Sequence, residues 1–493
     1  MTLREHDARL EHDPARVVAR FFLPGDGLPS SHSRVAQIIE RVLAAPRAQI
    51  EQKAAELVAD LSTRHADAAQ LLVDNATALI SRVYVAGELT EAQTLVLGAT
   101  FTAEYAVEGA ALCNPSAVEH PSQEGLEPGQ LRVAIATRCI GEGHISSIGF
   151  AEAVIDESGV WTFAPRARPL TLPRILGTDW SRDHFGRALE HDGHLDDLTD
   201  ALLSTLPERL TAPELEAALL ELPGQLAARP DSREPVRAMR DMIASTYRAE
   251  FPRHAPLSGR VLLPVAAEEN HGMEDARFVR FTDSDGIAGY RATYTAYDGR
   301  AIAPRLITSP DLVDFTIHRL TGSGAHNKGM ALFPRLIGQH HFALSRTDGE
   351  NISLARSSDG VIWEDRGIVH RPTEQWELVQ LGNCGAPIET GGGWLVLTHG
   401  VGPLRTYSLG AILLDLDDPS RVIARSAEPL LGPAGDLADG YVPRVVYSCG
   451  PIVHGGTLWV PVGVGDSHIR MFSIAMDELL DSLLRTPSLS SSG

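Results

Sequence analysis

The sequence has few cysteines and no long hydrophobic run. Its 493 residues contain four cysteines, Cys113, Cys139, Cys384 and Cys449, and none of them stands in a CxxC pair. This spacing argues against a zinc ribbon, a redox dithiol and a disulfide framework. No stretch reaches the ~20 apolar residues of a membrane span, and residues 1–20 are highly charged, without the apolar segment of a signal peptide. We therefore expect a cytoplasmic protein in a reducing compartment, with no membrane partner.

Positive charge is also scarce. The chain has 43 Lys and Arg residues against 64 Asp and Glu residues, a formal net charge of −21. Such a chain repels a phosphate backbone at long range, which disfavours nucleic acid as a partner. Local groups of basic residues would stand out against this background. No metal-binding motif is visible, so we expect no metal and no cofactor.

Two kinds of sequence pattern alternate along the chain. Short runs rich in β-branched and aromatic residues, separated by Gly, Pro and Asp, predict strands from about residue 104 onward. Apolar residues at a spacing of three to four predict helices before and between these runs. The helical segments are 36–43, 54–61, 68–85, 195–206, 212–222, 234–250 and 477–484.

A weak internal repeat lies in the strand-rich part. Residues 307–315 (ITSPDLVDF) resemble residues 355–363 (ARSSDGVIW), since each reads as a strand, a polar turn with Asp and an aromatic residue. The copies start 48 residues apart, which suits one four-stranded propeller blade. Ordinary hairpin turns are the alternative explanation. At ~50 residues per blade, the strand-rich part would hold five blades.

The predicted fold class is therefore mainly β, a five-bladed β-propeller with an N-terminal helical region and a helical insertion. The expected division is 1–104 for the N-terminal helical region, 105–190 for the first blade, 191–255 for the helical insertion, and 256–485 for the remaining blades and a C-terminal helix.

Polar residues concentrate in several otherwise apolar segments that come about once per predicted blade. The inner strands of propeller blades face a central channel, so these segments can converge on one pocket. Within one of them, Asp275 and Arg277 form either a simple ion pair or part of a site. Four basic residues would make a cationic patch: Arg138, Lys328, Arg346 and His399. Such a patch suits an oxyanion, although solvated surface charges, and a structural hydrogen bond for the histidine, are alternatives.

The order and spacing of these segments resemble glycoside hydrolase family 130, the mannoside phosphorylases and mannosidases. The resemblance runs from about residue 111 to residue 484, and the helical regions lie outside it, as in a long form of the family. The segments that carry it are Gly272–Arg277 (GMEDAR), Tyr294–Asp298, Asn327–Pro334, Gly382–Ile388, Gly393–Val401, Gly410–Pro419 and Tyr441–Gly450.

This resemblance implies a five-bladed propeller and inverting chemistry on β-mannosides. Asp275 falls on the family's catalytic acid, which protonates the glycosidic oxygen while inorganic phosphate attacks the anomeric carbon from the opposite face, giving α-mannose 1-phosphate. A bound phosphate needs cations to position it and no second carboxylate base. The expected partners are a small β-mannoside oligosaccharide and inorganic phosphate as co-substrate, for a glycoside phosphorylase of glycosyltransferase type.

The predicted site extends around this acid. Phosphate binding is assigned to Arg138, Lys328, Arg346, His399 and His144. Sugar contacts are assigned to Asn114, Ser116, Glu274, Arg277, Tyr297, Asn383, Tyr407 and Asp466. The chain departs from the family pattern at Ala276, where Pro is common, at Arg444, where Asn is common, and after Arg138, where some phosphorylases carry a further basic residue.

Two other functions stay open. An inverting β-mannosidase, for example of β-1,2-linked mannosides, would need a carboxylate such as Glu142 to activate water. A non-catalytic carbohydrate-binding propeller would hold the sugar without turnover. The two helical regions are candidates for homo-oligomer contacts or for a roof over the active site.

Overall fold

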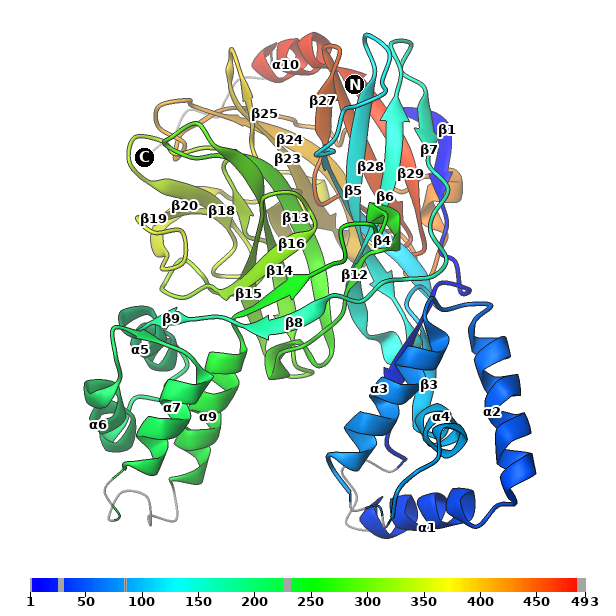
Figure 1. Ribbon diagram of the computed structural model, residues 1–493. Coiled ribbons are helices and arrows are strands. Elements are labelled where there is room, and N and C mark those ends of the chain that lie inside the picture. Colours follow the sequence, from blue (N-terminus) through cyan, green and yellow to red (C-terminus); the bar gives the residue numbers. More distant parts are fainter. Residues whose placement is uncertain are drawn as a thin grey trace. The chain divides into compact units, whose positions relative to one another are not determined.

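The computed structural model describes residues 2–24, 31–83, 85, 87–222, 224 and 232–485. The chain divides into two compact units. The larger comprises Met1–His12, Ala110–Arg166 and Leu172–Gly493, and the smaller comprises Asp13–Gly109 and Ala167–Thr171. The larger unit is mainly β, with a group of helices inserted between two of its strands (Figure 1).

Strands that follow one another in the chain pair to form the antiparallel sheets of the larger unit. The first sheet contains β4 (Ala111–Glu119), β5 (Leu131–Ile140), β6 (Ser146–Ile155), β7 (Trp161–Phe163) and β12 (Val261–Leu262). The second contains β13 (Gly272–Thr282), β14 (Ala288–Tyr297), β15 (Ile302–Ser309) and β16 (Asp314–Arg319), extended by β11 (Tyr247–Glu250) and β8 (Arg174–Gly177). A parallel bridge between Gly272 and Ser146 joins these two into one continuous sheet.

Three further sheets follow in chain order. The third contains β17 (Ala331–Leu332), β18 (His341–Ser345), β19 (Ile352–Ser357) and β20 (Glu364–His370). The fourth contains β21 (Gln380–Asn383), β22 (Ile388–Thr390), β23 (Gly393–Gly402), β24 (Thr406–Leu414) and β25 (Val422–Arg425). The fifth contains β26 (Val446–Tyr447), β27 (Ile452–His454), β28 (Thr457–Val464), β29 (His468–Ala475) and β1 (Arg4–Leu10), and helix α10 (Met476–Arg485) follows it.

Strand β1 differs from the helical region predicted for residues 1–104. It runs antiparallel to β29, with Arg4 opposite Ser473 and Leu10 opposite Ile469. Its REHDARL sequence is mostly polar, so neither helical nor strand periodicity is visible in it. Main-chain hydrogen bonds to the edge of the fifth sheet, which local sequence does not encode, decide its conformation.

Aromatic side chains fill the space between neighbouring sheets. Phe150 of the first sheet and Phe278 of the second pack with ring centroids 5.8 Å apart. Phe333, next to β17, and Trp394 of β23 pack edge to face at 5.0 Å, and both are fully buried. Burial of a side chain of this size contributes about 2–3 kcal/mol. This packing holds the sheets that carry the site residues in fixed positions.

The helical insertion lies between the paired edge strands β8 and β11 of the second sheet. It contains β9 (Trp180–Ser181), α5 (Arg182–His191), α6 (Asp197–Thr205), β10 (Arg209–Leu210), α7 (Ala212–Leu220) and α9 (Arg233–Ala244). Its own core is built from Trp180, Phe185, Leu189, Leu202 and Met239, among others.

The limits of this insertion differ from the predicted range 191–255. Helix α5 begins earlier, at Arg182, and the helix predicted over 234–250 ends at Ala244. Residues 247–250 form β11 instead, because pairing with β16 buries Tyr247 and Ala249. Tertiary pairing therefore overrides helical propensity at this end.

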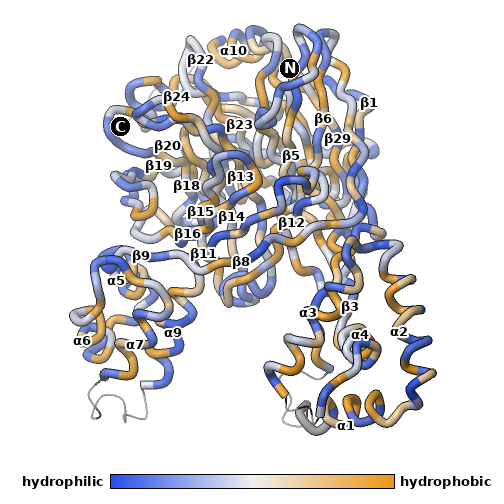
Figure 2. Tube along the Cα trace, viewed as in Figure 1, coloured by the Kyte–Doolittle hydropathy of each residue, from blue (hydrophilic) through white to orange (hydrophobic). Residues whose placement is uncertain are grey.

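The smaller unit is helical apart from one strand pair. It contains α1 (Ser31–Leu43), α2 (Arg47–Leu61), α3 (Ala68–Ile80) and α4 (Glu91–Thr100), with β2 (Val17–Phe21) paired to β3 (Thr102–Ala106). Figure 2 shows hydrophobic and hydrophilic stretches alternating along these helices. The helix predicted over 68–85 ends at Ile80, and Tyr84 lies outside the described residues. A side chain at Gly98 would place its Cβ 1.9 Å from the carbonyl oxygen of Leu72, so the contact between α3 and α4 requires glycine there.

Candidate active site

A cavity of about 130 Å³ collects side chains from four of the five sheets, together with Arg346, which directly follows β18 of the third sheet. Its lining consists of Asn114, Arg138, Asp275, Arg277, Lys328, Arg346, Gln380, His399, Arg405, Tyr407, Val442, Val445, Tyr447 and Asp466. Five of these carry a positive charge and two are carboxylates. In a protein of net charge −21, this local excess of positive charge marks a place suited to an anion.

Asp275 and Asn114 meet at matching irregularities of two strands. The pairing of β13 with β14 shifts between Glu274 and Arg277, and Asp275 there has a left-handed backbone with φ 57°. The pairing of β4 with β5 shifts in the same way beside Asn114, which has φ 48°. A non-glycine residue in this region costs about 1–3 kcal/mol and is concentrated at functional sites. The two turns bring the side chains together, and Asn114 Nδ2 donates to Asp275 Oδ1 at 2.5 Å.

The close approach of the first two sheets depends on Gly272. Its φ is 141°, a region that L side chains rarely adopt, and an added Cβ would lie 2.9 Å from the backbone nitrogen of Ser146. The first residue of the GMEDAR motif therefore allows the bridge between β13 and β6. This bridge sets Asp275 opposite the side chains of the first sheet.

Arg138 is engaged by the carboxylates of the motif. Its Nη1 donates to Asp275 Oδ1 at 3.3 Å, its Nη2 donates to Glu274 Oε1 at 2.6 Å, and its Nε donates to Ser146 Oγ at 2.8 Å. The guanidinium is thereby held from three sides. In this arrangement Arg138 orients Asp275. The sequence instead predicts that Arg138 binds phosphate.

The positive side chains around Asp275 control its protonation. Burial by itself would raise the pKa of Asp275. The charges of Arg138, Arg277 and Lys328 outweigh burial, and with the hydrogen bond from Asn114 they lower this pKa to about 2. Asp275 is therefore a carboxylate at neutral pH when the cavity is empty. An anion bound among these positive charges would offset them and raise this pKa.

Arg346 and His399 form a buried pair. Arg346 Nη1 lies 3.4 Å from His399 Nε2, and since a guanidinium only donates, Nε2 is the acceptor. The ring proton is then on Nδ1, which faces Cys384 Sγ at 3.6 Å. Burial, and next the charge of Arg346, holds the pKa of His399 well below its usual range. His399 is therefore neutral and positions Arg346, which differs from the cationic role predicted for it.

The space for this imidazole comes from a glycine. A Cβ at Gly382 would lie 2.4 Å from His399 Cε1 and 3.3 Å from Arg346 Nη1. The Gly382–Ile388 segment, which carries part of the family resemblance, thus leaves room for the pair. Without that space the ring could not lie beside Arg346.

Arg277 is buried beneath the cavity and supported by a tyrosine. Its Nη1 donates to the backbone oxygen of Asp275 at 2.9 Å, and its Nη2 donates to the hydroxyl of Tyr447 at 2.8 Å. Among the described residues, three buried polar atoms at this site have no hydrogen-bond partner: Asn114 Oδ1, Arg277 Nε and Arg346 Nε. Unsatisfied buried donors and acceptors are costly, and a bound ligand could satisfy them.

Three predicted site residues are partly or fully buried but do not line the cavity. Ser116 Oγ accepts from the backbone nitrogen of Phe278 at 2.9 Å and ties β4 to β13. Glu274 pairs with Arg138. Asn383 is buried, and neither of its amide atoms has a hydrogen-bond partner among the described residues.

Three others lie outside the cavity lining. The ring of Tyr297 contacts His271. His144 accepts or donates a hydrogen bond with the hydroxyl of Tyr441 at 2.9 Å on the exposed surface. Glu142, the predicted alternative base, is exposed on the short 3-10 helix Glu142–His144.

Tyr447 and Arg405 are among the lining residues that the sequence prediction did not include. Tyr447 lies within Tyr441–Gly450, one of the segments that carry the family resemblance. Its place in that segment was the only clue to it in the sequence. Arg405 ends a short 3-10 helix, Pro403–Arg405, with φ 57° and an exposed side chain. Nothing in its local sequence marks it.

Within the described residues, no group of three or more His, Cys, Asp or Glu side chains is placed to hold a metal ion.

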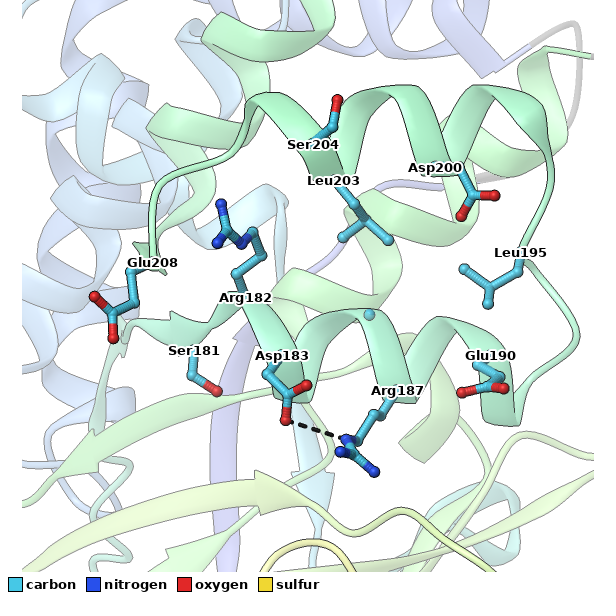
Figure 3. A pocket seen from close by; sticks show the side chains of 11 residues that line it. Ser181, Arg182, Asp183, Arg187, Glu190, Leu195, Asp200, Leu203, Ser204 and Glu208 are labelled. Atoms are coloured by element: carbon cyan, nitrogen blue, oxygen red, sulfur yellow. Dashed lines mark hydrogen bonds and ion pairs between the residues drawn. The ribbon is translucent and has the colours of Figure 1, made fainter.

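A much larger hollow lies elsewhere. It measures about 1020 Å³ between α5 and α6 and is lined by side chains of the insertion itself, such as Arg187, Leu203 and Glu208 (Figure 3). The pair between Arg187 and Asp183, at 3.1 Å, is exposed. This hollow has none of the buried charge that distinguishes the cavity around Asp275.

No helix in the described ranges is both long and apolar enough to cross a membrane.

Comparison with known proteins agrees with the motif pattern. The family model described as beta-1,4-mannooligosaccharide phosphorylase, for glycoside hydrolase family 130, matches residues 247–485. A 1,2-beta-oligomannan phosphorylase of Thermoanaerobacter sp. (strain X514) is 36% identical over 217 residues, covering 43% of this chain and 71% of the relative. A beta-1,2-mannobiose phosphorylase of Listeria innocua serovar 6a is 30% identical over 229 residues, covering 45% of this chain and 63% of the relative.

A solved structure is also similar. The complex of beta-1,2-mannobiose phosphorylase from Listeria innocua with beta-1,2-mannobiose aligns with a TM-score of 0.43 and 21% identity, over 77% of this chain and 93% of that one. At this level the structural likeness adds nothing to the assignment, which rests on the sequence matches. The resemblance inferred from the motifs is confirmed: the chain belongs to glycoside hydrolase family 130.

Proposed function

We propose that this chain is an inverting β-mannoside phosphorylase, which cleaves a β-mannosidic bond with inorganic phosphate and releases α-mannose 1-phosphate. The observation that carries the proposal is the cavity itself, where a carboxylate, Asp275, faces several cationic side chains in one small buried space. The phosphorylase names of the relatives support the same activity.

The proposed mechanism uses opposite faces of one mannosyl unit. Protonated Asp275 donates a proton to the glycosidic oxygen, directly or through a sugar hydroxyl, and the bond from that oxygen to the anomeric carbon breaks. A phosphate oxygen forms a new bond to the same carbon from the opposite face. The leaving sugar keeps the proton, and Asp275 regains one before the next cycle. An oxocarbenium-like transition state requires this combination of acid and nucleophile.

Phosphate binding and acid protonation are coupled in this proposal. Lys328 and Arg346 hold the phosphate, and Arg138 holds Asp275. A bound dianion offsets the positive charge that keeps the pKa of Asp275 low, so the acid gains its proton when the nucleophile is already present. This order protects the bond from cleavage without phosphate.

We further propose that the five sheets are the blades of a five-bladed propeller, closed by the pairing of β1 with β29. The cavity lining, which comes from four sheets and from Arg346 beside the third, supports this arrangement. A cytoplasmic location, supported by four buried cysteines that form no disulfide, and homo-oligomer contacts through the helical regions stay predictions.

A β-mannosidase is the second candidate, because the cavity contains another carboxylate. Asp466 lines it, and burial raises the pKa of Asp466. A hydrolase would use such a group to activate water. Glu142, which the sequence offers for this role, is exposed and outside the cavity lining.

One experiment separates these functions. The protein is incubated with β-1,2-mannobiose, β-1,4-mannobiose and mannosyl-glucose, with and without phosphate, and α-mannose 1-phosphate is followed by phosphorus NMR. We expect this product only when phosphate is present. Release of free mannose at the same rate without phosphate would establish the mannosidase, and binding without turnover of any mannoside would favour a carbohydrate-binding protein.

A further inference from the structure

A second polar depression lies beside the catalytic cavity, between the helical insertion, the second sheet and the loop that follows β16. It consists of two hollows of about 420 and 460 Å³ that share Asp192, His194, Glu268 and Asp298 in their lining. We call this depression the insertion groove. Each hollow is larger than the catalytic cavity, which leaves room for an extended ligand.

The insertion groove reaches the catalytic cavity through two consecutive residues. Asn327 lines the groove, and Lys328 lines the cavity. Asn327 has a left-handed backbone with φ 62°, and its Oδ1 accepts from the backbone nitrogen of Lys328 at 2.9 Å. Adjacent Cα atoms are about 3.8 Å apart, so the linings of the groove and of the cavity adjoin at this pair of residues.

The wall that the insertion contributes is held firmly on the sheet. Arg319 of β16 is almost fully buried; its Nη2 donates to Asp192 Oδ1 at 2.6 Å, and its Nη1 pairs with Glu268. Arg305 of β15 pairs with the same Glu268 at 2.8 Å. Arg319 lines the groove, and its Nε is a buried donor without a hydrogen-bond partner among the described residues. The groove therefore has a fixed wall with unused hydrogen-bonding capacity.

The chemistry of the groove suits a neutral polyol. The rings of His191, at the end of α5, and His326 stack with centroids 4.4 Å apart at 28°. Burial, and next the neighbouring His326, lowers the pKa of His191, so at neutral pH its imidazole is an uncharged donor and acceptor. The carboxylates of Asp192, Glu268 and Asp298 accept hydrogen bonds and repel anions. A sugar chain fits this lining, whereas phosphate does not.

We propose that the helical insertion provides a distal subsite for the leaving side of the substrate, in which His191, His194, His326 and Asn327 bind sugar units beyond the one next to the cleaved bond. The inference rests on the proposed function and names its substrate class, β-mannoside oligosaccharides longer than a disaccharide. The catalytic cavity is small, so a single mannosyl unit occupies it and the rest of the chain lies outside. The groove is the adjoining surface built to receive it.

The test measures chain-length dependence in two variants. His191→Ala removes half of the stack, and His326→Ala removes the other half from an exposed loop position whose loss leaves the core intact. For each protein, kcat/KM for phosphorolysis is measured with β-mannobiose, β-mannotriose and β-mannotetraose. We expect the ratio of tetraose to biose to fall about tenfold in each variant, the effect of one lost polar contact. His254→Ala, an exposed histidine outside the groove lining, is the matched control and should keep the wild-type ratio.

The reverse reaction tests whether the groove binds the leaving side of the substrate, which is the acceptor in that direction, or the donor side. With α-mannose 1-phosphate as donor, His326→Ala should raise KM for a mannobiose acceptor about tenfold and leave KM for the donor unchanged. An altered donor KM instead would overturn the leaving-side assignment. A wild-type ratio in both variants would overturn the subsite, while phosphorolysis of mannobiose would still uphold the proposed function. If wild-type protein shows no phosphorolysis, calorimetric titration with mannotetraose decides separately, because equal affinity of wild type and His191→Ala would also refute the groove.

Discussion

The catalytic cavity and the insertion groove are lined by the consecutive residues Lys328 and Asn327, and their charges are of opposite sign. The cavity gathers cationic side chains around Asp275, whereas the groove is lined by carboxylates and by histidines, among them His191, whose pKa is lowered by burial. The same polar residue types therefore serve different ligands, an anion in one place and a neutral sugar chain in the other. The difference comes from the numbers of charged groups: the groove lining holds five carboxylates and two arginines, whereas the cavity lining holds five cationic side chains and two carboxylates.

The largest expected effect tests the acid in the cavity. Asp275→Asn keeps the shape of the side chain, and asparagine tolerates a left-handed backbone, so folding should be preserved. Loss of the proton donor should lower kcat for phosphorolysis about 10³-fold. Steady-state kinetics measures this, with Asp285→Asn in an exposed turn as the matched control. Turnover at the wild-type rate would remove Asp275 from the mechanism.

The cationic side of the comparison depends on Arg346. Arg346→Ala should raise KM for phosphate about 100-fold, since a desolvated charged contact is worth about 3 kcal/mol, and should change KM for the mannoside far less. Arg366→Ala, an exposed arginine, is the control. An increase confined to the mannoside KM would show that Arg346 binds sugar and that the phosphate lies elsewhere.

Acid should loosen the groove wall before the catalytic wall. His184 on α5 and His318 on β16 each have a pKa lowered to about 4, mainly by burial, against about 6.5 in the unfolded chain. They stay neutral in the folded protein while the unfolded chain takes up protons, so stability is complete above pH 6.5 and falls toward pH 4. At pH 5 each histidine should cost about 2 kcal/mol.

Hydrogen exchange measured at pH 7 and pH 5, corrected for intrinsic rates, can follow this loss. Amides of α5 and β16 should lose more protection than those of β5, which carries Arg138. His184→Phe should reduce the pH dependence at α5. Equal loss of protection in all three elements would contradict the proposed difference between the walls.

The smallest expected effect is a proton count. Because phosphate should raise the pKa of Asp275 from about 2, its binding should be accompanied by uptake of up to one proton near pH 6. Calorimetric titration of phosphate in two buffers with different ionisation enthalpies measures this number. Asp275→Asn should abolish the uptake. An unchanged proton count in that variant would place the titrating group on the phosphate itself.

Part of the site was predictable from sequence because the family motifs keep their order and spacing. Asp275, Lys328, Arg346 and His399 were expected near one another, and the structure places all four around one cavity. The neutral state of His399 was not predictable, since it follows from burial and from Arg346, a residue 53 positions away. Arg138 was assigned to phosphate because its charge is readable in sequence, whereas its bonds to Asp275 and Glu274 are not.

The fold shows the same division. Alternating patterns and turns predicted the strands, and helical spacing predicted most helices of the insertion. Strand β1 and the end of α9 were missed, because pairing with a distant strand decides each of them.

By itself, the sequence determined the family, the type of most elements and the residue types of the site, because periodicity and motif spacing are local properties of the chain. Only the tertiary structure decided which of these residues meet. Asn114 and Asp275 are 161 positions apart, and their contact requires two strand irregularities and one glycine at the bridge between two sheets. It also decided that the insertion faces the loop of Asn327, which places a groove for a neutral ligand beside a cavity for an anion. Contacts at such separations depend on the packing of whole sheets, and no local pattern encodes them.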